Sequence, residues 1–329
     1  MKFLSRLRGA FSRPLSPSGE LTKEEYNPPY LWSKGISQYC DFKGSDTYWC
    51  EKTESCQTEL FFNKHYAGAS GVVWVRMSTQ SRDGKLCDLD NFVRGALPTI
   101  REPFALVTTD GDVSIPSDLP KATVNALLNC PWLVAWYTQN YDGHPHEKFV
   151  PFPIGLDLHT PHFSSNPAQI VAELGRIRGD RLPIDQVPLK VFCDLEVSLT
   201  SEERHRAVAS LRKYDHVYFL RKRLSQINIW RRYAQYPFVV STVGNGLDCH
   251  RTWELLYLGA IVITKTSSLD HLYEGLPVVI VGDWSEVGEK NNLRKWLQQY
   301  ARLTDREYIY GRLEPGRMIK SIRETLAKS

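Results

Sequence analysis

Residues 238–254 read FVVSTVGNGLDCHRTWE, a sequence that combines an apolar run, a turn and the start of a helix. The apolar run 238–242 predicts a buried strand, and Gly244 with Gly246 permits a tight turn after it. A helix is expected to begin near His250. A strand that leads through a glycine-containing turn into a helix is typical of parallel α/β sheets, which bind ligands beyond the carboxyl ends of their strands.

The same alternation of strands and helices continues on both sides of this stretch. The expected strands are 72–77, 104–108, 133–137, 149–154, 190–194, 216–220, 260–264 and 278–281, and the expected helices include 119–128, 168–178, 202–213 and 224–236. Strands that alternate with helices form parallel sheets covered by helices. The sequence therefore predicts an α/β fold with two Rossmann-like domains that face each other across a cleft.

The run PFPIG at 151–155 interrupts this alternation and separates the two domains. We predict five parts in chain order. They are a basic, irregular segment 1–60 packed on the first domain, an N-terminal domain 61–155, a hinge region 156–187, a C-terminal domain 188–300, and C-terminal helices 301–329.

The charge of the chain is concentrated at its amino terminus. The net charge is +4, and residues 1–14 hold Lys2, Arg6, Arg8 and Arg13 without any acid. These four are among 41 basic residues, so the rest of the chain is balanced against its 37 acidic residues. A neutral body argues against a dedicated nucleic-acid binder, which needs a basic surface to neutralise phosphates.

The cysteines and apolar runs indicate where the chain resides. Its seven cysteines lack the paired short spacings of zinc sites and disulfide frameworks, so a reducing, cytoplasmic location is expected, with one disulfide among Cys40, Cys50 and Cys56 as the alternative. No apolar run approaches the roughly 20 residues of a membrane span. Apolar residues of 1–14 share one helical face, which predicts either a weak contact with an anionic membrane surface or a frayed terminus.

The helix start near His250 combines groups that can hold a nucleotide sugar. Its unpaired N–H groups and its dipole favour a phosphate, and Arg251 adds a planar guanidinium for the diphosphate oxygens. Glu254 lies one helical step further, where a carboxylate can accept hydrogen bonds from ribose hydroxyls. The alternative is structural: the glycines turn the chain, Asp248 caps the helix, and Arg251 pairs with Glu254 on a solvated face.

The segments 251–263 (RTWELLYLGAIVI), 276–281 (LPVVIV) and Asp283-Trp284 resemble the C-terminal domain of exostosin-type glycosyltransferases. The resemblance covers roughly residues 215–290, and more loosely 153–157. It implies the GT-B architecture, with the nucleotide-sugar donor on the C-terminal domain and the acceptor mainly on the N-terminal one. It also implies inverting transfer without a metal or other cofactor, from a donor that we expect to be UDP-linked.

The resemblance by itself implies Arg251 as the diphosphate contact and Glu254 as the ribose contact, and the turn and helix start around them complete the predicted set of donor-binding residues. They are Gly244, Asn245, Gly246, Asp248, His250, Arg251 and Glu254, with Arg221 and Arg223 as further phosphate contacts or simply solvated side chains. The N-terminal half departs from the long ectodomain of animal exostosins, so the resemblance does not imply which glycan is the acceptor. A compact form such as microbes or large algal viruses encode fits the chain better.

Two groups in the first half are candidates for the base that an inverting transfer requires. Asp110 and Asp112 follow the apolar run 104–108, and one of them could deprotonate the acceptor hydroxyl. Carboxylates at this spacing could instead hold a manganese ion under the diphosphate, or form a plain Asp-Gly turn. His144 and His146 offer a possible cleft contact or a second choice of base, against a polar surface turn.

Three alternatives to the inverting, metal-independent transferase therefore remain open. One is a metal-dependent transferase that uses Asp110 and Asp112, the second is an epimerase of sugar nucleotides, and the third is a non-catalytic glycan-binding relative.

Overall fold

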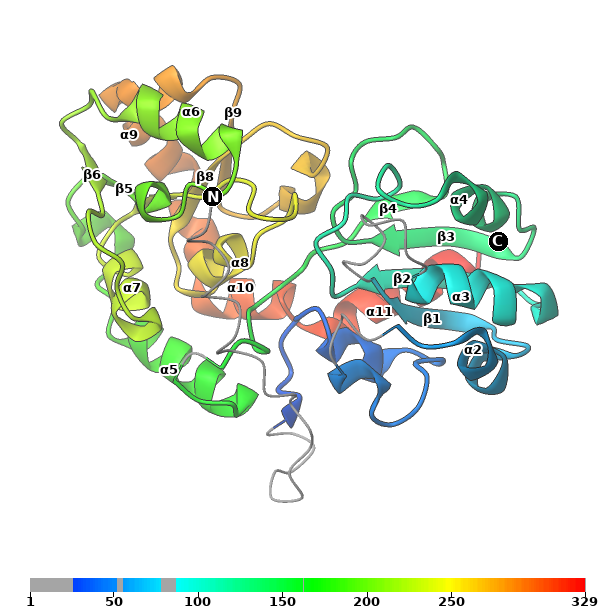
Figure 1. The fold of residues 1–329 in the computed structure, drawn as a ribbon. Coiled ribbons are helices and arrows are strands. Elements are labelled where there is room, and N and C mark those ends of the chain that lie inside the picture. Colours follow the sequence, from blue (N-terminus) through cyan, green and yellow to red (C-terminus); the bar gives the residue numbers. More distant parts are fainter. Residues whose placement is uncertain (1–25, 52–55, 78–86, 162, 329) are drawn as a thin grey trace, which may run out of the picture.

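The computed structural model describes residues 26–51, 56–77, 87–161 and 163–328, which fold around two parallel sheets (Figure 1). The expected membrane-contact segment 1–14 lies outside these described residues. No helix in the described part of the chain is long and apolar enough to cross a membrane. All seven cysteines are free thiols, so the disulfide considered for Cys40, Cys50 and Cys56 is not formed.

The first sheet contains four parallel strands in the order β1-β2-β3-β4. The strands are β1 (Gly71–Arg76), β2 (Phe104–Thr109), β3 (Leu133–Thr138) and β4 (Phe149–Pro151), and the helices around them are α2 (Glu59–Tyr66), α3 (Asp88–Gly95) and α4 (Lys121–Leu128). The three helices lie together on one face of the sheet, where α3 contacts β1, α2 and α4 (Figure 1). Phe62, Tyr66 and Phe92 form an aromatic cluster within this layer.

The second sheet contains five parallel strands in the order β6-β5-β7-β8-β9. The strands are β5 (Val191–Cys193), β6 (Val217–Phe219), β7 (Phe238–Val240), β8 (Ile261–Lys265) and β9 (Val278–Val281), and the helices are α5 (Pro167–Gly179), α6 (Glu202–Leu211), α7 (Gln226–Tyr233), α8 (His250–Tyr257) and α9 (Lys290–Tyr300). Successive side chains of β7 point to opposite faces, as a strand requires. Phe238 and Val240 join the core on the side of α6 and α9, whereas Val239 joins the core on the side of α7 and α8.

The end of the chain returns to the first sheet. After α10 (Arg306–Arg312), helix α11 (Pro315–Leu326) contacts β1, β2 and the short helix Gly35–Tyr39 (Figure 1). An ion pair of 2.7 Å joins Arg323 to Asp41. The other short 3-10 helices are Tyr48–Cys50, Leu97–Thr99, Ile184–Gln186, Leu195–Val197, Asp270–Tyr273, Trp284–Gly288 and Ala301–Thr304.

The predicted fold class of two Rossmann-like α/β domains is confirmed by these sheets, and the carboxyl ends of their strands face each other. Asn140, which follows β3, accepts a hydrogen bond from the backbone of Asp248, which follows β7. Ser268, which follows β8, donates to the backbone carbonyl of Tyr141. The edges at which parallel sheets bind ligands therefore meet between the two domains.

Two helices of the first domain have no counterpart in the sequence prediction. Helix α2 spans the boundary at residue 60, up to which loops were expected. Helix α3 buries Asp88, Asp90 and Asn91, so its apolar spacing does not mark its buried face. Asp88 pairs with Arg76 at 2.8 Å, and Asp90 accepts hydrogen bonds from Thr123 and the Cys87 backbone. The burial of these polar side chains depends on partners that only the folded chain supplies.

Candidate functional site

The order of strands in the second sheet places a switch point between β5 and β7. The chain passes from β5 outward to β6, then returns across the sheet to β7 on the other side of β5. Connections on either side of such a point diverge, which leaves a crevice at the carboxyl ends of the two strands. Asp194 lies directly after β5, and the stretch 241–249 lies directly after β7.

Two arginines lie near this switch point, and one of them pairs with Asp194. Arg251, in the first turn of α8, places its Nε 3.4 Å from Asp194 Oδ1 and donates to the hydroxyl of Tyr233 at 3.3 Å. Tyr233 in turn donates to Asp194 Oδ2 at 2.7 Å. Arg204, from the first turn of α6, donates through Nε to the carbonyl of Val243 and through Nη1 to the carbonyl of Ser198. The switch point thus holds one arginine paired with Asp194 and a second arginine fixed by backbone carbonyls.

The positive charge at this point is only partly neutralised. Burial by itself lowers the pKa of Arg251, but the charge of Asp194 reverses this effect, so its pKa lies well above the ordinary value. The pKa of Arg204 is lowered by burial and by the positive charge of Arg251. Nη1 of Arg251 is buried and has no hydrogen-bond partner. A buried donor without a partner is unfavourable, and an anionic ligand would satisfy it.

A small cavity adjoins the loop after β7, in which Val243 accepts a hydrogen bond from Arg204. It has a volume of about 110 Å³ and is lined by residues that follow β7, including Thr242 and Cys249, and by the last residues of β8, Thr264 and Lys265. Cys249 is the N-cap residue of α8, and no side chain caps this helix end. Because the first N–H groups of a helix have no partner within it, this end of α8 can donate to a phosphate.

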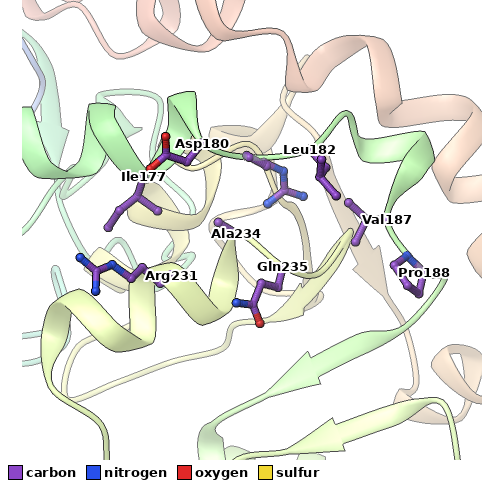
Figure 2. A pocket seen from close by; sticks show the side chains of 9 residues that line it. Ile177, Asp180, Leu182, Val187, Pro188, Arg231, Ala234 and Gln235 are labelled. Atoms are coloured by element: carbon purple, nitrogen blue, oxygen red, sulfur yellow. The ribbon is translucent and has the colours of Figure 1, made fainter.

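Larger cavities of about 350 and 600 Å³ lie elsewhere, near α5. Figure 2 shows the first, between α5 and α7, with Val187 and Pro188 just before β5 and Gln235 just before β7. It therefore opens at the amino ends of the strands, away from the switch point. Arg178 and Arg181 line the larger cavity. Arg178 donates to the carbonyl of Leu258 at the end of α8, and Arg181 donates to the carbonyl of Tyr233 at the end of α7. These arginines thus satisfy carbonyl groups that have no partner within their helices. We therefore place the candidate site at the switch point.

The loop predicted to hold the donor has a different geometry from the one expected. Neither Gly244 nor Gly246 is among the described residues with positive φ, so the turn does not depend on a left-handed glycine. Gly246 is instead required by a close approach, because a Cβ there would lie 2.7 Å from Nδ2 of Asn140. Asn245 is exposed beside it.

Asp248 and His250 connect the loop to the segment that leaves the first sheet. The Asp248 carboxylate accepts hydrogen bonds from the backbone N–H of Ile154 at 2.7 Å, from Cys249 at 2.8 Å and from the Trp253 indole at 3.0 Å. Asp248 therefore does not cap α8 in the usual way. Burial raises its pKa to about 6. His250 Nδ1 lies 2.8 Å from the carbonyl of Gly155, and burial lowers the pKa of His250.

Glu254 is buried and does not pair with Arg251. Its carboxylate accepts a hydrogen bond from the Trp230 indole at 2.9 Å and from Gln226 at 3.4 Å, both from α7. Glu254 is 4% exposed, so the alternative of an Arg251–Glu254 pair on a solvated face is wrong. Its proposed hydrogen bonds with ribose remain a prediction.

Arg221 and Arg223 are exposed in the loop after the edge strand β6. They make no hydrogen bond or ion pair with any other described residue, and the structure does not bring them to Asp194. Their contact with phosphate remains a prediction.

Asp110 directly follows β2 and has a strained backbone conformation. Its φ is +67°, its side chain is 6% exposed, and its Oδ2 lies 3.3 Å from Lys34 Nζ without a hydrogen bond. A non-glycine residue in this conformation is often part of a functional site. Asp112 lies two residues further and is half-buried.

A single side chain connects this turn to the loop after β7. Asn140 donates through Nδ2 to the carbonyl of Gly111 at 2.9 Å and accepts through Oδ1 from the backbone of Asp248 at 2.8 Å. Asp110 and the predicted donor loop, which are far apart in the sequence, are therefore two hydrogen bonds apart in the fold.

His144 and His146 lie in the turn between β3 and β4. The carbonyl of His144 accepts a hydrogen bond from Tyr141, and the His146 ring accepts one from the backbone of Lys148. The turn approaches the second domain, since a Cβ on Gly143 would lie 3.1 Å from Ser268. Local hydrogen bonds account for both histidines as parts of a turn, and their role in the cleft remains a prediction.

Sequence reasoning missed Asp194, Arg204 and Asn140. Arg204 carried a signal, because a cation in the first turn of a helix opposes the helix dipole and requires a compensating reason. Asp194 directly follows a short apolar run, the position at which parallel strands place ligand-binding residues. No local signal distinguishes Asn140 from other polar residues of a loop.

No protein-family model matches the chain, and no curated protein does. Among solved structures, it resembles a UDP-forming α,α-trehalose-phosphate synthase from Burkholderia vietnamiensis at 10% identity and a TM-score of 0.39, over 78% of this chain and 71% of that one. It also resembles AviGT4, a glycosyltransferase involved in avilamycin A biosynthesis, at 14% identity and a TM-score of 0.34, over 74% and 80%. The N-terminal domain of Candida albicans trehalose-6-phosphate phosphatase shares 12% identity at a TM-score of 0.37, over 82% and 68%. Likenesses at this level do not assign a function to the chain.

Proposed function

We propose that the protein is an inverting glycosyltransferase that moves a sugar from a UDP-linked donor to a hydroxyl of a glycan acceptor. The observation that carries this proposal is the pair Arg251 and Arg204 at the switch point of the second sheet, with Nη1 of Arg251 buried and unpaired. A diphosphate is the anion that best matches two planar guanidinium groups beside an uncapped helix end.

In this proposal, the arginines carry the charge that the leaving group requires. As the bond from the anomeric carbon to the diphosphate breaks, negative charge develops on the leaving oxygen. Arg251, Arg204 and the first N–H groups of α8 are held in position by the fold and can stabilise that charge without a metal ion. Glu254, oriented by Trp230, would bind the ribose.

Asp110 is the proposed base. An inverting transfer needs a group that removes the proton from the acceptor hydroxyl on the face opposite the leaving nucleotide. Asp110 lies on the domain opposite the arginines, and its turn is joined to the donor loop through Asn140. Its Oδ2 accepts no hydrogen bond from the described residues, and the charged Nζ of Lys34 lies 3.3 Å from it.

The experiment that tests the donor site is calorimetric titration of UDP into Arg251→Ala and wild-type protein. Loss of a charge-assisted contact is expected to weaken binding about 10- to 100-fold. Arg206→Ala is the matched control, since Arg206 lies on α6 but is exposed and pairs with Glu202. Equal UDP affinity of wild type and Arg251→Ala would exclude Arg251 as a diphosphate contact, provided that circular dichroism shows both proteins to be folded.

A donor and acceptor assay separates transfer from the other functions. Consumption of the donor that yields an epimeric sugar nucleotide without acceptor would support the epimerase instead. UDP binding without transfer to any acceptor of a glycan panel would indicate the non-catalytic relative. If a chelator abolished the transfer activity and only manganese restored it, the alternative in which Asp110 and Asp112 hold a metal would be supported.

A further inference from the structure

Three metal-ligating side chains meet where the segment leaving the first sheet passes the start of α8. Asp157, His159 and His250 each offer a ligand atom, and these atoms all lie within 4.8 Å of one another. Asp157 and His159 come from the segment after β4, and His250 is the first residue of α8. All three residues are half-buried. Within the described residues, this is the single cluster of three or more such groups.

The ring of His250 is oriented as in a metal ligand. Its Nδ1 lies 2.8 Å from the backbone carbonyl of Gly155, which can accept a hydrogen bond but cannot donate one. Nδ1 therefore carries the proton, and the lone pair of neutral His250 is on Nε2. Histidine ligands of metals typically donate their other ring N–H to a carbonyl or carboxylate in this way.

His159 supplies an independent second observation. Its Nδ1 is buried without a hydrogen-bond partner, although Oδ1 of Asp157 lies 3.2 Å away. The ring of His159 lies 5.3 Å from the ring of His250, measured between centroids. A buried ring nitrogen that lacks a hydrogen bond beside a carboxylate requires an explanation, and a shared cation supplies one.

We propose that Asp157, His159 and His250 bind one divalent transition-metal ion of the Zn²⁺ and Co²⁺ class. Two imidazoles and one carboxylate favour such ions over Mg²⁺ and Mn²⁺, which prefer oxygen ligands. Bonds of about 2.0–2.1 Å at tetrahedral angles place ligand atoms roughly 3.4 Å apart. The ligand atoms of the cluster lie within 4.8 Å of one another, so binding would require side-chain rotations that draw them closer, and the fourth position would be left to water.

The ion would join the two domains at their connection. One pair of ligands belongs to the segment that leaves β4, and the third belongs to the helix that begins beside the donor loop. Binding would therefore fix the start of α8 relative to the first domain, as the hydrogen bond from Ile154 to Asp248 already does. This role is structural, and it does not depend on the proposed glycosyl transfer.

The first measurement is titration of Co²⁺ into the metal-free full chain, followed by visible absorption and by calorimetry. Wild type is expected to bind one equivalent with the intense visible bands of a four-coordinate site. His159→Ala and Asp157→Asn are expected to weaken binding about 100-fold. His271→Ala is the matched control, because His271 and Glu274 form an exposed pair at 2.9 Å without a third ligand. This variant should bind Co²⁺ as wild type does.

A thermal-shift experiment with Zn²⁺ gives a readout that does not depend on colour. Zn²⁺ is expected to raise the Tm of wild type and of His271→Ala, and to leave that of His159→Ala unchanged, because a ligand stabilises only the state that binds it. Equal Co²⁺ affinity of wild type and His159→Ala, or no binding by folded wild type, would overturn the site. Neither readout involves nucleotide, so the result is separate from the test of Arg251.

Discussion

The amide side chain of Asn140 joins the two domains by accepting a hydrogen bond from the backbone of Asp248 at 2.8 Å. The same side chain donates to the carbonyl of Gly111 and is fully buried. The backbone of Asn140 has a φ of +55°, which asparagine adopts more readily than most residues. Asn140 thus positions the proposed base segment and the proposed donor loop against each other.

Gly246→Ala should destabilise the protein through this contact. An added Cβ would lie within 3.0 Å of three atoms of the Asn140 side chain, which is held at both ends and cannot move aside. We expect a loss of about 1–3 kcal/mol in the free energy of unfolding, measured by urea denaturation. Gly179→Ala, at the end of α5, is the control because an added Cβ meets nothing within 4 Å. Equal stability of the two variants would contradict the role of the close approach.

The raised pKa of Asp248, about 6, predicts a dependence of stability on pH. The folded protein binds this proton more tightly than the unfolded chain, so the contribution of Asp248 to stability is highest below about pH 4 and declines as pH rises through 6. Asp248→Asn removes this titration. Its stability relative to wild type is therefore expected to increase by about 2–3 kcal/mol between pH 4 and 7. Parallel stability profiles of the two proteins over this range would contradict the raised pKa.

Glu254→Gln tests the ribose contact by comparing two ligands. Wild type is expected to bind UDP more tightly than 2′,3′-dideoxy-UDP, since a carboxylate accepts hydrogen bonds from the missing hydroxyls. In Glu254→Gln this difference should shrink at least severalfold, whereas Gln226→Ala, which removes a weaker contact to Glu254, should retain most of it. Calorimetry measures both affinities. A difference that is the same in wild type and Glu254→Gln would exclude Glu254 from ribose binding.

Asp110→Asn should lower kcat by about 10²- to 10⁴-fold and leave UDP affinity unchanged, because a base acts on the acceptor and not on the donor. Asparagine also tolerates the positive φ at this position. Asp112→Asn is the comparison that decides which carboxylate is the base. A normal kcat in Asp110→Asn would move the assignment to Asp112 or to a histidine.

The transfer step is expected to proceed without a metal ion, which is measured as turnover with and without a chelator. Chelation of wild type would also empty the cluster of Asp157, His159 and His250, so the test uses His159→Ala. Whatever turnover this variant retains is expected to be equal with and without chelator. A chelator-sensitive rate that Mn²⁺ restores would show that the diphosphate requires a hard cation.

The sequence alone predicted the elements whose residue pattern is visible within a short stretch of chain. The strand at 278–281 matches β9 in full, and the helix expected near His250 begins there. Apolar runs of four to six residues between turn signals describe buried parallel strands well. Helix α3 was not predicted because its buried side chains include carboxylates, whose partners Arg76 and Thr123 lie in other elements.

The tertiary structure decided which of these residues act together. The sequence placed Arg251 in the first turn of a helix and gave Glu254 the same face, but their partners are Asp194 and Tyr233 in one case and Trp230 in the other. Periodicity reports which side of an element is buried and carries no information about which strand becomes its neighbour. The pairing of β5 with both β6 and β7 created the switch point, and that pairing depends on contacts between residues far apart in the chain.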